Sequence, residues 1–121
     1  MAKKGKKAAL RLLHSVTAER AQRLYRLLQL LGIGPQSRAS VTRRLRLDVR
    51  GFYRDLKLLR AAGIAVPLRN GRYTLEESVP AATNRLPFPD PHLTLGEAIQ
   101  LAKGRSLAHR KLKAQIGLIV P

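Results

Sequence analysis

Three cations spaced along one short segment are the residues of this chain best suited to chemistry. Arg50, Arg54 and Lys57 stand at positions i, i+4 and i+7, so an α-helix would place their side chains on one face. An arginine can donate two hydrogen bonds to the O6 and N7 atoms of guanine, and a lysine can contact a base edge or a phosphate. The spacing therefore predicts a recognition helix that reads the major groove of duplex DNA. The alternative is a solvated helix side.

Val49, Gly51 and Tyr53 complete this predicted recognition surface. The Tyr53 ring could pack on a sugar, or its hydroxyl could donate to a phosphate. Glycine costs about 1 kcal/mol relative to alanine inside a helix, so Gly51 indicates either a close approach of the backbone to DNA or tolerance near a helix end. Asp55 interrupts the cationic run. We expect it to pair with an arginine of the same helix or of the helix before it, because phosphate would repel it.

Polar residues ahead of the predicted recognition helix are expected to contact the DNA backbone. They are Ser37, Arg38, Arg43 and Arg44. Ser37 also suits the N-cap of a short helix that runs to about Leu45, because its hydroxyl can accept a backbone N–H bond. The two roles of Ser37 do not exclude each other.

A β-hairpin is predicted after the recognition helix. Asn70-Gly71 lies between two β-prone segments, and both residues tolerate positive φ. Arg69, Asn70 and Arg72 surround the hairpin tip, where they would form a wing that reaches a minor groove or flanking phosphates. A simple solvated turn is the alternative. Pro67 restricts the first strand to a sheet edge or a bulge.

Three helices must position these residues. The first begins at its N-cap Thr17 and ends at Gly32–Pro35, where a glycine can take the left-handed conformation and a proline cannot continue the helix. Its inner face is predicted to hold Ala21, Leu24, Leu27, Leu28 and Leu31. The short second helix and a turn at 46–48 follow. The third helix covers 49–61, is capped by Asp48 and ends at Gly63, with Phe52, Leu56 and Leu59 facing inward.

The ends of the chain are predicted to lie outside this three-helix unit. Residues 1–16 form a basic arm, which is either a solvated tail or a further phosphate contact. Residues 77–93 contain four prolines and are expected to be an extended linker. A capping-box pattern at Thr94 opens a C-terminal helix over 94–121, weakened in the middle by Gly104. Its apolar stripe over 94–119 would support a homodimer, or the helix would pack back on the same core.

Composition narrows the classes of partner. The chain has 121 residues, with 24 Lys and Arg against 7 Asp and Glu, so its formal net charge is +17. Such a charge attracts polyanions, nucleic acid above all, although an acidic membrane surface would be attracted too. No apolar run approaches the roughly 18 residues that a membrane-spanning helix needs. We therefore expect no membrane partner and a cytoplasmic, nucleoid-associated protein.

Catalysis and metal binding find no support in the sequence. The chain has no cysteine, and its three histidines, His14, His92 and His109, show no metal-ligand spacing. Its serines lack a nearby histidine and acid, and its glycines form no phosphate-binding loop. We expect no enzyme, no metal and no cofactor.

Three stretches together resemble the N-terminal domain of WYL-type bacterial transcriptional regulators, which are related to the DeoR type. They are Arg23–Leu31, Phe52–Ile64 with its Tyr-Arg-Asp-Leu and Leu-Arg-Ala-Ala-Gly-Ile runs, and Gly71–Leu75. The resemblance covers about residues 18–76 and implies a winged helix-turn-helix that binds duplex DNA through the helix at 49–61. The chain departs from the family at Asp48–Gly51, where a serine- or threonine-rich start is usual. It also contains no tryptophan and shows no sensor domain.

The sequence thus predicts a mainly α fold with a small β-hairpin: a winged helix-turn-helix at 17–76 plus a C-terminal helix. The predicted function is sequence-specific binding of double-stranded DNA by a transcriptional regulator. A non-specific DNA- or RNA-binding architectural protein and a winged-helix protein–protein adaptor are the alternatives.

Overall fold

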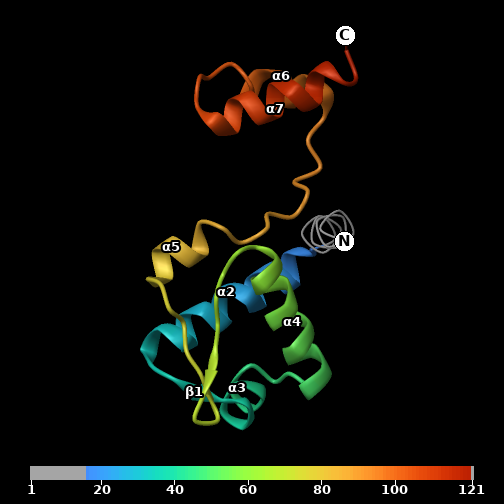
Figure 1. Cartoon of the computed structure of the whole chain (residues 1–121). Helices are drawn as coiled ribbons and strands as arrows, with labels where there is room; N and C mark the ends of the chain where they lie inside the picture. The colour runs from blue at the N-terminus through green and yellow to red at the C-terminus, as the bar shows by residue number, and fades with distance from the viewer. Residues whose placement is uncertain (1–15, 121) are drawn as a thin grey trace, which may run out of the picture. The chain divides into compact units, whose positions relative to one another are not determined.

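The computed structural model describes residues 16–120, so the predicted basic arm lies outside the described residues except for Val16. The chain divides into two compact units, Met1–Pro89 and Asp90–Pro121. As predicted, the fold is mainly helical with a small antiparallel sheet (Figure 1).

Helix α2, Ala18–Ile33, supplies the largest share of the first unit's core. Thr17 caps it as predicted, with its hydroxyl accepting a bond from the Arg20 backbone N–H at 3.1 Å. Its buried side chains are leucines: Leu24, Leu27, Leu28, Leu30 and Leu31. The prediction that a glycine at the end of this helix takes the left-handed conformation is wrong. Gly34 is extended, with φ 161°, because the chain passes directly into a strand.

Helices α3, Arg38–Arg44, and α4, Val49–Ala61, follow the predicted boundaries. The Ser37 hydroxyl caps α3, and the Asp48 carboxylate caps α4 by accepting a bond from the Gly51 N–H at 2.6 Å. Four residues join the two helices, and Arg46 in this turn has a positive φ of 51°. Leu47 packs against the core from the turn.

The C-terminal end of α4 is closed by a left-handed glycine. Gly63 has φ 81°, and its N–H donates to the Arg60 carbonyl while the Ile64 N–H reaches back to the Leu59 carbonyl. These two bonds satisfy carbonyls that the helix end would leave free. Leu59 and Ile64 are both fully buried, so the same turn directs the chain back onto the core.

A three-stranded antiparallel sheet in the order β1-β3-β2 packs beside these helices. Strand β2, Leu68–Arg69, and strand β3, Arg72–Tyr73, form the predicted hairpin. Asn70 and Gly71 at its tip both have positive φ, 51° and 73°. β2 is an edge strand, as Pro67 requires. Strand β1, Gln36–Ser37, was not predicted, because two residues carry too little pattern to indicate a strand.

Residues 77–93 are not extended throughout, which corrects the predicted linker. Helix α5, Val79–Thr83, forms within them and packs on α2. Ser78 caps this helix, and Pro80 is tolerated because the first helical turn needs no N–H from it. Ala82 is buried in the core, and the bare backbone of Gly32 leaves the space that Val79 occupies.

The second unit consists of two helices rather than the single predicted one. Helix α6, Leu95–Leu101, is opened by the predicted capping box of Thr94 and Glu97, and helix α7, Leu107–Gly117, by a second one of Ser106 and His109. The helix breaks before Gly104, whose bare backbone the His109 ring approaches. The two helices pack on each other, yet Ala102 is the one residue of Asp90–Val120 classed as buried.

Candidate nucleic-acid interface

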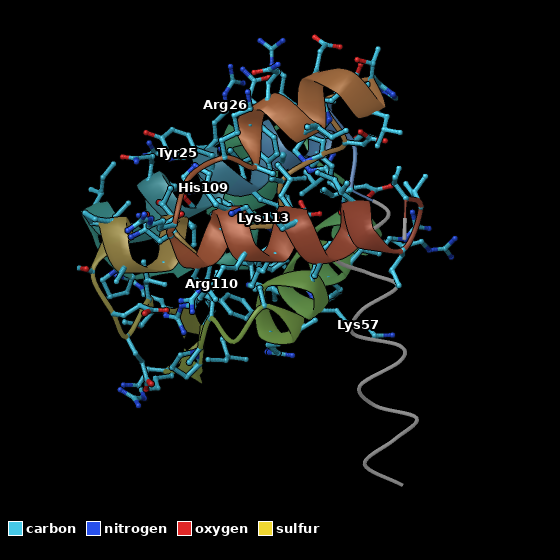
Figure 2. All side chains as sticks on the ribbon, turned by 90° about the horizontal axis from the view of Figure 1, so that it is seen from above. Tyr25, Arg26, Lys57, His109, Arg110 and Lys113 are labelled. Carbon is cyan, nitrogen blue, oxygen red and sulfur yellow. The ribbon has the colours of Figure 1, made fainter. Side chains whose placement is uncertain are left out.

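The outward face of α4 carries the side chains of five of the six residues in the predicted recognition surface. Arg50, Arg54 and Lys57 are exposed, and Lys57 points away from the helix (Figure 2). Val49 and Tyr53 are each 45% exposed. These five side chains line one shallow open depression of about 550 Å³. The helix therefore presents three cations, a phenol and a small apolar group together on one accessible surface.

Asp55 lies on the opposite side of α4 and is fully buried. It binds two arginines of α2: Arg23 donates to its two carboxylate oxygens at 2.7 and 2.9 Å, and Arg20 donates to one of them at 3.2 Å. The prediction of an arginine partner is confirmed, but the predicted helix is wrong. The partners come from the first helix because Asp55 faces the core, where α2 packs.

This ion-pair cluster links α2 to the backbone of α4 as well. Arg20 also donates to the Arg54 carbonyl at 3.2 Å. The hydrogen bond to Asp55 raises the pKa of Arg23. Because Asp55 is the one carboxylate in the sequence of α4 and is turned inward, the exposed surface of this helix holds basic residues without an acidic one.

Packing within the protein explains why position 51 is a glycine, and neither expectation from the sequence included this explanation. A Cβ atom there would lie 2.7 Å from Leu47 Cδ1 and 2.8 Å from the Asp48 carboxylate. The missing side chain therefore lets the N-cap Asp48 and the turn residue Leu47 pack against the first turn of α4.

A cluster of hydroxyl and guanidinium groups joins α3, α4 and the hairpin. Arg38 Nη1 donates to Tyr53 Oη at 3.1 Å. Hydrogen bonding with Arg38, and secondly with Tyr73, lowers the pKa of Tyr53. Burial raises the pKa of Tyr73. The Tyr73 ring packs edge-on against Phe52, with centroids 5.1 Å apart. Tyr73 lies outside the predicted site, since its strand position predicted only a sheet residue.

The other residues predicted to contact the DNA backbone or a minor groove differ in whether their side chains already have a partner within the protein. The Ser37 hydroxyl is used as the α3 N-cap. Arg43 and Arg44 are exposed in the last turn of α3. In the hairpin, Arg69 pairs with Glu76 at 2.8 Å, while Asn70 and Arg72 are exposed. The sequence did not predict the pairing of Arg69, because an exposed ion pair leaves no periodic signal.

Arg20 and Arg23 are the residues that sequence reasoning missed. A signal was present, since Asp55 stands three residues after Phe52 and four before Leu59, so the helix period places it on the inward face. A carboxylate on such a face needs a partner. Arg20 and Arg23 each precede a core leucine of the first helix by four residues, which places them on the matching side.

No protein-family model matches this chain, and neither a curated protein nor a solved structure matches it. Among the described helices, none has the length and apolar content to cross a bilayer. Function must therefore be inferred from the chain's own residues and their arrangement.

Proposed function

We propose that this protein binds double-stranded DNA sequence-specifically and regulates transcription, with α4 in the major groove. One observation carries the proposal: the exposed face of α4 holds Arg50, Arg54 and Lys57, while its one carboxylate is buried and neutralised by α2. The exposed face of α4 is therefore cationic without an acidic residue of the helix beside it, which suits a helix that approaches phosphates and base edges.

The order of elements supports a winged helix-turn-helix. Four residues join α3 to α4, a length typical of the helix-turn-helix. The β2–β3 hairpin follows and would be the wing, with Arg72 and Asn70 directed at flanking backbone or a minor groove. This arrangement agrees with the resemblance of residues 18–76 to WYL- and DeoR-type regulators.

The second unit would pair two copies of the chain. Eight of its large apolar residues keep between 39% and 87% of their surface exposed, and exposed apolar surface of this kind is what a partner can cover. They are Leu93, Leu95, Ile99, Leu101, Leu107, Leu118, Ile119 and Val120. A dimer through 94–119 would read two half-sites about one helical turn apart, or a multiple of that.

The test is selection of bound duplexes from a random DNA library at near-physiological salt, with excess RNA as competitor. An enriched motif would support the proposal, and a symmetric motif would indicate a dimer. Tight binding at low salt without enrichment would contradict specific recognition and favour the non-specific architectural alternative. Loss of all DNA to the competitor would favour RNA, and no nucleic-acid binding would favour the adaptor.

A further inference from the structure

The hydrogen bond between Arg38 and Tyr53 connects the first residue of α3 to the exposed face of α4. Arg38 Nη1 lies 3.1 Å from Tyr53 Oη, and the two residues are separated by 15 positions in the chain. Both side chains are exposed. This contact therefore belongs to the surface that the proposed function assigns to DNA.

The donor and acceptor roles in this contact are fixed by chemistry. A guanidinium has five N–H donors and no acceptor, whereas a phenol has one O–H donor and accepts through its oxygen. Arg38 must therefore donate, and Tyr53 must accept. The phenol hydrogen of Tyr53 remains available to a further acceptor, and a cation donating to the same oxygen makes it a stronger donor.

The surroundings of this hydroxyl fit an anionic acceptor. An open depression of about 330 Å³ is lined by residues of α3, α4 and the hairpin. Its lining residues, none of which carries a carboxylate, are Ser37, Arg38, Ala39, Tyr53, Leu68, Gly71 and Tyr73. A phosphodiester supplies oxygens that only accept, together with one negative charge that the Arg38 guanidinium would attract.

We propose that Arg38 and Tyr53 act as one unit that binds a single backbone phosphate at this depression. Tyr53 donates its hydroxyl hydrogen to the phosphate, and Arg38 positions the phenol and supplies the charge. The inference rests on the proposed DNA binding and deepens it, since it makes Arg38 act through Tyr53 rather than as an independent contact. Tyr73, buried and held edge-on by Phe52, closes the floor beside them.

The test is a double-mutant cycle on a labelled duplex, using Tyr53→Phe, Arg38→Gln and both together. Tyr53→Phe should weaken binding about 5- to 10-fold, by equal factors on selected and random duplexes, because a phosphate contact carries no sequence information. In the Tyr53→Phe background, Arg38→Gln should cost at most about half of its factor in the wild type. Arg43→Gln, also an exposed arginine of α3, is the control and should cost the same factor in both backgrounds.

A second measurement identifies the phosphate. Duplexes with one neutral methylphosphonate are scanned along the site, and the Tyr53→Phe defect should disappear at a single position. Multiplicative losses from Arg38→Gln and Tyr53→Phe, or no loss with Tyr53→Phe, would overturn the paired site while DNA binding itself stands. Failure of the wild-type protein to bind any duplex would overturn both proposals together.

Discussion

At the scale of single residues, Asp55 separates the two faces of α4. A charge that would repel phosphate on the outer face instead stabilises the inner face, where Arg20 and Arg23 hold it. Removing one partner of a buried ion pair is more costly than losing an exposed one, because a buried charge is left with fewer partners. The orientation of α4 on α2 therefore depends on this cluster as well as on leucine packing.

Replacement of Arg23 tests this role. Arg23→Ala should lower the free energy of unfolding by about 2–3 kcal/mol, somewhat less than the full cost of breaking a buried pair, because Arg20 still binds Asp55. Arg26→Ala is the matched control. Arg26 is an exposed arginine of the same helix, and its loss should change stability by about 0.5 kcal/mol or less. Urea unfolding followed by circular dichroism gives both values, and equal losses would contradict the role of the cluster.

Arg54 lies at the middle of the exposed cationic face of α4. Arg54→Ala should cost about 1–3 kcal/mol of binding energy on a selected duplex and relax the preference at one base position. Arg20 donates to the backbone carbonyl of Arg54. This hydrogen bond does not involve the Arg54 side chain, so the fold should persist. Binding titrations against single-base variants of the site measure both effects. An equal loss on every sequence would show that Arg54 contacts phosphate and does not read a base.

At the scale of elements, the sequence predicted the parts that carry strong local signals. The bounds of α4 and the hairpin tip agree with expectation, because Asp48, Gly63 and Asn70-Gly71 each fix the backbone locally. The position of Arg50, Arg54 and Lys57 on one exposed face of α4 followed from helical spacing alone. Strand β1 and helix α5 could not be predicted, since both are short and depend on partners distant in the chain.

Helix α5 illustrates such a dependence, and Gly32 tests it. A Cβ atom at Gly32 would clash with Val79, so Gly32→Ala should destabilise the fold by about 1–2 kcal/mol, since overpacking outweighs the better helix propensity of alanine. In a Val79→Ala background the same change should be neutral or stabilising. Gly34→Ala is the control, since nothing lies within 4 Å of a Cβ there. Thermal unfolding of the wild type and these four variants measures the effects, and a Gly32→Ala loss that persists in the Val79→Ala background would contradict this packing.

At the scale of the whole molecule, the two units differ in how well they bury apolar surface. The first unit has a continuous core to which α2, α3, α4, the hairpin and α5 all contribute. The second unit buries Ala102 and leaves most of its larger apolar side chains exposed. Three of its cations, Arg110, Lys111 and Lys113, lie on α7, and Figure 2 labels Arg110 and Lys113. A unit of 32 residues (Asp90–Pro121) is too short to bury a sufficient hydrophobic core by itself.

A second copy supplies the missing apolar surface if the groove between α6 and α7 is the interface. This groove has a volume of about 330 Å³, and its lining includes Leu95, Leu112 and Ile119. Ile119→Glu would place a charge in that interface, so sedimentation equilibrium should show a dimer for the wild type and a monomer for the variant. Leu118→Glu introduces the same charge at a neighbouring residue that is 87% exposed and outside the groove lining, and it should remain dimeric. Because a dimer must bind two half-sites, Ile119→Glu should also reduce affinity for a selected inverted repeat while leaving a single half-site unaffected. A monomeric wild type, or two variants that dimerise equally, would contradict this interface.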